Sequence, residues 1–499
     1  DLNSRFKIKN RVDSVLIKNL EIMRECFLEK IDSIPIVHCL LGRAILIKYL
    51  EDRKDSKGNS AFPNGFFTNF LPEAKSFTDV LSNKDATYKM FTFFQEKFHG
   101  DMFPLTDMEI NAVGDSELSL LKDFLTGKIE LSINQYNFWP LYTFNLIPVQ
   151  LISTIYELFF KLATEEENKK GNKKSRNGTY YTPYHLVEMM MDEVLPWDGE
   201  YSEIRILDPA CGSGVFLVEA YRRIVIKWMN SRNIDHIEPE DLKELLSKHI
   251  FGVDCNDEAI RIASFSLCLV LCDYLEPLSI WNELQFPQLK GENLYVCDFF
   301  DKTADFNKYK YDLIIGNPPW ESNLTNLASD YIGVTKYPIG DNQISQAFTW
   351  KAAELCKDEG NVCLLMPSKG FLFNRSTTNT NYRKTFFHTN DVMTIINFSG
   401  FRSELFENAK SPATAVYFKP KSKNEGNYIY YCTPKPTYTI EDRRQFLIEP
   451  LDICRLPKDT IYNEYIWKIA MFGGPRDLEL IDKLTNQFKT LEEYALSAK

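Results

Sequence analysis

The stretch "EIRILDPACGSGVF", residues 203–216, joins a short apolar segment to a glycine turn and the start of a helix. The apolar residues before Asp208 indicate a buried strand, and "GVFLVEAYRRIVIKWMN" after it is typical of a helix. Gly212 and Gly214 would let the backbone approach a ligand closely, beside unpaired N–H groups at the helix start. The turn lacks the third glycine of the dinucleotide fingerprint, and Asp208 would repel a pyrophosphate. The stretch therefore favours a positively charged ligand that carries an adenosine, rather than NAD.

The same alternation of strand and helix continues along the chain. Further strands are predicted at "HIFGVDCN", "ENLYVCDFF", "KYDLIIGNPPW", "NVCLLMPS" and "VMTIINFS", which begin at residues 249, 292, 310, 361 and 392. This order predicts an α/β fold with a doubly wound, parallel, Rossmann-like sheet. Right-handed crossovers place all strand C-termini at one edge, where ligands bind. We therefore expect Asp208, Asp254, Asp298 and Asn317 to line one crevice.

Two further acids suit a nucleoside. Asp254 ends the second predicted strand, where an acid typically accepts hydrogen bonds from both ribose hydroxyls. It could instead cap the helix that follows, although Asn256 fits that cap better. Asp298 could accept from an adenine amino group while Phe299 covers the ring. The alternative for Asp298 is ordinary turn chemistry.

The segment "DLIIGNPPWESN", Asp312 to Asn323, ends a strand with an amide, two prolines and an indole. Pro318 and Pro319 remove two N–H donors, so this segment cannot continue a ladder of hydrogen bonds. The Asn317 side chain and the Pro318 carbonyl offer two acceptors, and Trp320 offers a flat face. An exocyclic amine on a planar base needs these groups. The alternative is a plain rigid turn.

The rest of the chain suggests how it is organised. Its 499 residues predict two or more domains. Residues 1–163 have helical periodicity and predict a helical packing domain, and residues 164–178 form a polar, lysine-rich linker. A catalytic domain is expected over 179–425, and 426–499 is expected to be a carboxy-terminal extension. Because residue 1 is Asp and no signal segment opens the chain, we expect a fragment or a processed chain.

Composition excludes several classes of protein. The formal net charge of −11 argues against a surface coated uniformly for nucleic acid. No apolar run approaches the roughly 20 residues of a membrane helix, so no membrane partner is expected. The 11 cysteines include no CxxC pair and the six histidines are dispersed, so we expect no metal site. Reduced thiols in a cytoplasmic protein are the simplest interpretation.

The order of these motifs resembles the S-adenosylmethionine-dependent DNA amino-methyltransferases. It is most similar to the adenine-N6 enzymes whose cofactor motifs precede the catalytic one, an order called gamma-type. The stretch "NGTYYTPYHLVEMMM", which starts at Asn177, strengthens the resemblance. In that family a similar stretch closes over the methionine end of the cofactor. The resemblance covers residues 178–420 and implies a class I methyltransferase fold that acts on adenine in duplex DNA.

The resemblance also implies roles for particular residues. The cofactor S-adenosylmethionine would be bound by Tyr181, Thr182, Pro183, Asp208, Pro209, Ala210, Cys211, Gly212, Gly214, Asp254, Asp298 and Phe299. Catalysis would use Asn317, Pro318, Pro319 and Trp320. Trp320 would stack on the flipped base, and Phe406 would stack on its other face, with Phe401 as the second candidate.

The helical front and the motif order together resemble fused restriction-modification enzymes of the type IIG kind. Those enzymes carry a nuclease domain upstream and a target-recognition domain downstream, and we expect any such domain to lie outside this chain. The extension 426–499 would lead towards a missing or truncated recognition domain. Three alternatives remain: methylation of RNA guanine, methylation of protein glutamine, or an inactive DNA-binding scaffold subunit.

Overall fold

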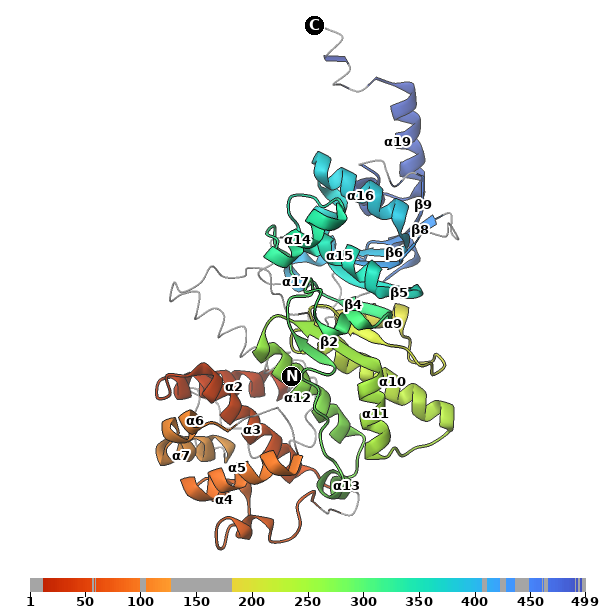
Figure 1. The fold of residues 1–499 in the computed structure, drawn as a ribbon. Coiled ribbons are helices and arrows are strands. Elements are labelled where there is room, and N and C mark those ends of the chain that lie inside the picture. Colours follow the sequence, from red (N-terminus) through yellow and green to blue (C-terminus); the bar gives the residue numbers. More distant parts are fainter. Residues whose placement is uncertain are drawn as a thin grey trace, which may run out of the picture. The chain divides into compact units, whose positions relative to one another are not determined.

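The computed structural model describes residues 12–55, 58, 60–98, 105–126, 182–405, 411–421, 428–435, 448–459, 461, 465–489, 491 and 494–495. These residues belong to two compact units (Figure 1). The first unit comprises Asp1–Ser175, Leu195–Glu203 and Cys211–Cys297. The second comprises Arg176–Val194, Ile204–Ala210 and Asp298–Lys499. The predicted linker 164–178 lies outside the described residues, and the predicted domain boundaries stay predictions.

The first unit begins with helices, as the apolar periodicity predicts. They are α2 (Val12–Leu28), α3 (Ile34–Asp52), α4 (Phe77–Val80), α5 (Lys84–Phe98), α6 (Asp107–Ala112) and α7 (Asp115–Leu125). Helix α3 is buried on nearly every side, because apolar residues occupy its whole circumference rather than one stripe. It therefore forms the centre of this helical part.

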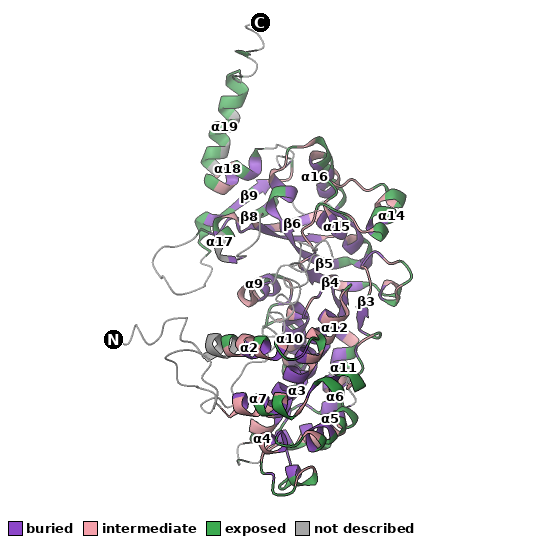
Figure 2. Cartoon of the chain, turned by 90° about the vertical axis from the view of Figure 1, so that its left-hand side faces the viewer, coloured by how far each residue is buried: buried purple, intermediate pink, exposed green. Residues whose placement is uncertain are grey.

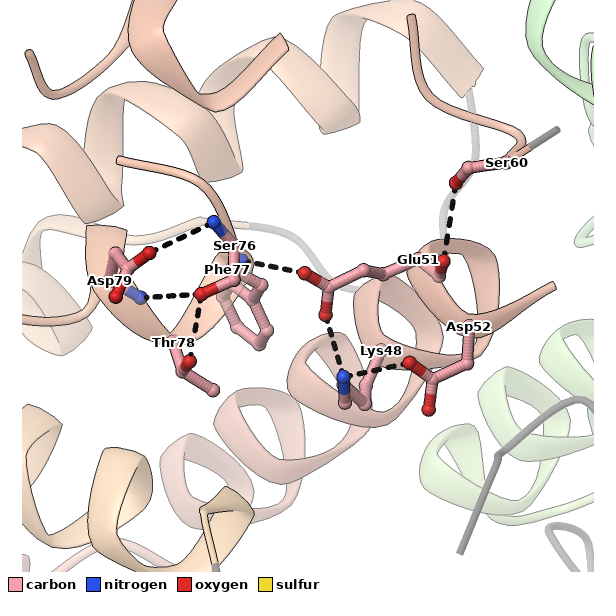
Figure 3. A network of polar contacts seen from close by, with 8 residues as sticks. All are labelled: Lys48, Glu51, Asp52, Ser60, Ser76, Phe77, Thr78 and Asp79. Atoms are coloured by element: carbon pink, nitrogen blue, oxygen red, sulfur yellow. Dashed lines mark hydrogen bonds and ion pairs between the residues drawn. The ribbon is translucent and has the colours of Figure 1, made fainter. Parts of the chain in front are cut away.

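A polar network joins the end of α3 to the start of α4 (Figure 3). The Phe77 N–H donates to Glu51 Oε1 at 2.9 Å, and Lys48 Nζ donates to Glu51 Oε2 at 2.8 Å. Ser76 and Asp79 form a reciprocal capping box that satisfies two N–H groups at the start of α4. Polar groups thus fix the four-residue helix α4, which is too short to be stable by itself.

The remainder of the first unit is α/β. It consists of α10 (Val215–Arg232), α11 (Pro239–His249), β2 (Ile250–Asp254), α12 (Asp257–Asp273), α13 (Pro277–Asn282) and β3 (Leu294–Val296). Strands β2 and β3 pair in parallel, with Asp254 opposite Val296. Helices α10 and α12 both pack on β2. The predicted strands at 249 and 292 and the helices after Gly214 and Asn256 are confirmed.

The second unit contains the other seven described strands. They are β1 (Ile206–Asp208), β4 (Tyr311–Gly316), β5 (Cys356–Pro367), β6 (Asp391–Asn397), β7 (Ala413–Lys419), β8 (Tyr428–Cys432) and β9 (Ile453–Pro457). Their order in the sheet is β1-β4-β5-β7-β6-β8-β9. The helices of this unit are α9 (Tyr184–Val194), α14 (Asn326–Thr335), α15 (Ile344–Leu355), α16 (Thr377–Thr389), α17 (Arg402–Leu405), α18 (Ile466–Phe472) and α19 (Pro475–Gln487).

The predicted sheet was purely parallel, and this part of the prediction is wrong. Strand β7, which the sequence pattern did not identify, lies between β5 and β6 and is antiparallel to both. Strand β9 is antiparallel to β8. A parallel return after β6 needs a crossover helix, but the described part of the 398–412 connection holds only a 3-10 turn and the four-residue α17. The predicted α/β class with an amino-terminal helical part is confirmed.

Burial follows the sheet in the second unit (Figure 2). The last six residues of β5, Val362 to Pro367, are all buried, as are the first six of β7. Helix α19, by contrast, is exposed along its described side chains. None of the 11 cysteines forms a disulfide, and Cys255 alone among them is exposed. Burial raises the pKa of Cys363, which keeps that thiol protonated and unreactive.

Candidate active site

The glycine turn of the first unit is fixed from both ends. The Cys211 N–H donates to the Val253 carbonyl at 3.0 Å, and the Gly214 N–H donates to the Cys211 carbonyl at 2.8 Å. Gly214 has a φ of +85°, and a Cβ there would lie 3.0 Å from the Cβ of Ala263 in α12. Gly212 has a φ of +53°, but a Cβ there would meet nothing within 4 Å. Gly214 is therefore required for packing, whereas Gly212 leaves open space above the turn.

Asp254 connects the end of β2 to this turn. Its Oδ2 accepts from the Gly212 N–H at 3.0 Å and its Oδ1 accepts from the Asn256 N–H at 2.8 Å. The carboxylate is half-buried. Asn256, not Asp254, caps α12, because its side chain accepts from the N–H groups of Glu258 and Ala259. The sequence prediction about this cap is confirmed.

Asp208, in the second unit, lies at the end of β1 and is only 1% exposed. Its Oδ1 accepts from the Ala210 N–H at 3.0 Å, which shapes the chain on either side of Pro209. The carboxylate also packs against Gly316, the last residue of β4. A Cβ at Gly316 would lie 2.3 Å from Asp208 Oδ1 and 3.1 Å from Pro209 Cδ. Gly316 thus packs closely against two predicted site residues, Asp208 and Pro209, and the sequence analysis did not single it out.

Asn317 follows Gly316 and contacts a segment 135 residues earlier in the chain. Its Nδ2 donates to Oγ1 of Thr182 at 3.1 Å. Thr182 is 5% exposed and lies two residues before the start of α9. The Pro183 carbonyl accepts from the N–H groups of Leu186 and Val187, so this segment is the first turn of that helix. The structure therefore brings together two predicted site residues, Thr182 and Asn317; Tyr181 lies outside the described residues.

The ring of Trp320 is held by a hydrogen bond to the neighbouring strand. Its indole Nε1 donates to the Leu365 carbonyl of β5 at 3.1 Å. Pairing between β4 and β5 ends one residue earlier, at Gly316 and Leu364, because Pro318 and Pro319 have no N–H to continue it. The indole therefore supplies the donor that the two prolines cannot. No pattern in the sequence indicated that the Leu365 carbonyl would accept this hydrogen bond.

Asp298 and Phe299 take part mainly in local packing. Asp298 Oδ1 accepts from the Phe300 N–H at 2.9 Å, which is the turn geometry considered as the alternative for this acid. Phe299 is 3% exposed and stacks on Phe348, with ring centroids 4.9 Å apart. Lys351 Nζ lies 5.1 Å from the Phe299 ring. The role predicted for Asp298 and Phe299 beside an adenine stays a prediction.

The remaining predicted residues contribute less to the described geometry. Phe406 lies outside the described residues, and Phe401 is buried, with 6% of its surface exposed.

Within the described ranges, no group of three or more His, Cys, Asp or Glu side chains could hold a metal ion. No helix in the same ranges has the length and apolarity needed to cross a membrane.

Comparison with known protein families gives a match over more than half of the chain. The family is described as N-6 DNA Methylase, and it matches residues 149–463. The matched range includes every residue singled out above in the glycine turn, in the NPPW segment and at Thr182.

Two curated relatives show how far the likeness extends. The type II restriction enzyme and methyltransferase RM.Eco57I of Escherichia coli is 24% identical over 58% of this chain, but the match spans only 33% of that relative. The type I restriction enzyme HindI methylase subunit of Haemophilus influenzae is 23% identical over 79% of this chain and 76% of the subunit.

Two solved structures share the fold. The type IIL restriction-modification enzyme MmeI, in complex with DNA, has a TM-score of 0.53 at 14% identity, covering 87% of this chain and 60% of MmeI. The type IIG restriction endonuclease BpuSI has a TM-score of 0.50 at 12% identity, covering 93% of this chain and 46% of BpuSI. At these identities the likeness concerns the fold alone.

Proposed function

Because the chain belongs to the N-6 DNA methylase family, we propose that it transfers a methyl group from S-adenosylmethionine to the N6 amine of adenine in duplex DNA. We also propose that it serves a restriction-modification system, acting on DNA in the cytoplasm. The observation that carries the proposal is the NPPW segment at the end of β4. There Thr182 holds the Asn317 amide, and the Leu365 carbonyl holds the Trp320 ring.

This arrangement suits an aromatic amine, which is a poor nucleophile because its lone pair is delocalised into the ring. Asn317 Oδ1 and the Pro318 carbonyl would accept hydrogen bonds from the two amine hydrogens. These contacts favour a more tetrahedral nitrogen and stabilise the positive charge that develops on it. Trp320 would hold the ring by stacking. The target adenine lies inside a duplex, so it must be flipped out to reach these groups.

The glycine turn of the first unit fits the cofactor. Gly212 leaves open space above the turn, and the half-buried Asp254 carboxylate is held beside it by the Gly212 N–H. We propose that Gly212 and Asp254 bind S-adenosylmethionine, with Asp254 on the ribose. When bound, this cofactor supplies an activated methyl group. We propose that Asp298 and Phe299 lie beside the adenine. Asp208 accepts from the Ala210 N–H within its own segment.

Replacing Asp254 with alanine should weaken S-adenosylmethionine binding by roughly ten- to hundredfold, because two hydroxyl partners and the bond from Gly212 are lost. Isothermal titration calorimetry on the 499-residue chain measures this change. Asp235→Ala, an exposed aspartate in the same unit, is the matched control and should bind as the parent does. An unchanged affinity in Asp254→Ala would remove this residue from the ribose role.

The proposed function is tested by incubating the chain with duplex DNA and methyl-labelled S-adenosylmethionine, then digesting the DNA to nucleosides. We expect the label in N6-methyl-2′-deoxyadenosine. Label in N4-methyl-2′-deoxycytidine would assign a different base, and label in RNA or protein added to parallel reactions would support the alternatives named above. Cofactor binding without transfer to any of these substrates would indicate an inactive scaffold, or an activity that needs another subunit.

We also propose that the chain acts together with a target-recognition or nuclease domain that is not part of these 499 residues. The RM.Eco57I relative, by its name, is both a restriction enzyme and a methyltransferase, and this chain matches 33% of it. Adding a cognate partner to the methylation assay would separate an incomplete enzyme from an inactive one, because only the incomplete enzyme would gain activity.

A further inference from the structure

An asparagine amide has two ends of similar shape and opposite polarity. The oxygen accepts hydrogen bonds, and the NH2 group donates them. If Asn317 served the adenine amine with its NH2 group, donor would face donor. Some contact must therefore decide which end faces the base. In the structure Asn317 Nδ2 donates to Thr182 Oγ1 at 3.1 Å, which engages one of the two N–H groups of the amide and keeps Oδ1 on the side away from the hydroxyl.

Thr182 is well placed to fix this orientation. Its side chain is buried, and threonine has few rotamers because its Cβ is branched. Pro183 follows it, which restricts the backbone of the preceding residue to extended conformations. The chain then enters α9, whose buried Leu186, Val187, Met190 and Met191 anchor the segment. The hydroxyl is thus attached to a restrained support.

We propose that Thr182 is a positioning residue for methyl transfer: it holds the Asn317 amide so that Oδ1 faces the target amine. This assignment differs from the contact with the methionine end of the cofactor that the family resemblance implies for the same segment. It rests on the proposed function, in which Asn317 serves the adenine. Thr182 itself touches neither the base nor the methyl group in this proposal.

The test compares Thr182→Val, which keeps the shape of the side chain but removes the acceptor, with Thr182→Ser, which keeps the hydroxyl. Single-turnover and steady-state assays with labelled cofactor give kcat, KM for duplex DNA and Kd for S-adenosylmethionine. For Thr182→Val we expect kcat to fall by roughly ten- to hundredfold, with Kd and KM within about twofold of the parent. Thr182→Ser should recover most of the lost kcat.

Repeating Thr182→Val in a chain that already carries Asn317→Asp tests whether Thr182 orients the Asn317 amide or only stabilises the surrounding segment. Asn317→Asp replaces the amide with a carboxylate, whose two oxygens are equivalent, so no wrong end exists. Adding Thr182→Val to Asn317→Asp should then reduce kcat by less than about threefold, well short of the effect in the parent. Thr335→Val, which removes a local hydroxyl-to-carbonyl bond in α14, is the control and should leave kcat unchanged.

Each result decides between distinct ideas. A parent chain that methylates no adenine defeats the proposed function itself. An active parent whose Thr182→Val variant keeps its kcat defeats the positioning role alone. A variant with a tenfold weaker cofactor Kd and an unchanged kcat would assign Thr182 to the cofactor instead. If Thr182→Val does not fold, Thr182→Ala replaces it, because it removes the same acceptor without placing an apolar branch there.

Discussion

Replacing Asn317 with alanine should reduce methyl transfer to adenine by roughly a hundred- to a thousandfold, because the variant loses a hydrogen-bond acceptor that is needed as charge develops on the amine. The Kd for S-adenosylmethionine should stay within about twofold, since the side chain serves the target base. Labelled methyl incorporation into duplex DNA measures the transfer rate, and calorimetry measures cofactor affinity on the same preparation.

The control for this variant lies six residues further along the chain. Asn323 is exposed and has the same side chain, so Asn323→Ala removes an amide from the same segment without touching the NPPW turn. Its transfer rate should equal that of the parent. Substantial residual transfer by Asn317→Ala would mean that the Pro318 carbonyl and the Trp320 ring suffice, and Asn317 would then lose its proposed role.

The elements around these residues were predictable where the pattern is local. Strand β2 and helix α12 follow from an apolar run, an asparagine cap and a helical period, and each of these signals lies within a few residues of the element it specifies. The cap was assigned to Asn256 rather than Asp254 from spacing alone, and the hydrogen bonds to Glu258 and Ala259 confirm it.

Contacts between segments that are far apart in the chain could not be predicted from the sequence. The bond between Thr182 and Asn317 spans 135 residues, and nothing in either local pattern specifies the other. Strand β7 was missed for a related reason. Its position between β5 and β6 depends on which strand it pairs with, and one apolar run can pair in either direction.

Phe299 illustrates a second limit of prediction from sequence, which concerns the role of a single residue. An aromatic residue after a strand suggests a ring that covers a ligand, but its 3% exposure reflects packing on Phe348. A single sequence cannot tell a ring that stacks on a ligand from one that stacks on a neighbouring side chain, because both need the same residue type. Gly316 did carry a local signal: a glycine that ends an apolar strand often marks a close backbone approach.

That close approach makes Gly316→Ala the second substitution from which we expect a large effect. The new Cβ would lie 2.3 Å from Asp208 Oδ1, so either the carboxylate or the end of β4 must move. Asp208 is 1% exposed and holds the Ala210 N–H, which leaves it little room to yield. Asn317 is the next residue, and a shift of about 1 Å in a reacting group can lower a rate by roughly a hundredfold.

We therefore expect Gly316→Ala to lower methyl transfer by roughly a hundredfold and to destabilise the fold by about 1–3 kcal/mol, as overpacking does. Methyl incorporation and the midpoint of thermal unfolding are the measurements. Gly333→Ala in α14 is the matched control, because a Cβ there meets nothing within 4 Å and its φ is ordinary. If the Asp208 clash is the cause, adding Asp208→Ala to Gly316→Ala should cost less stability than the two single changes together. Additive losses would place the cause elsewhere in β4.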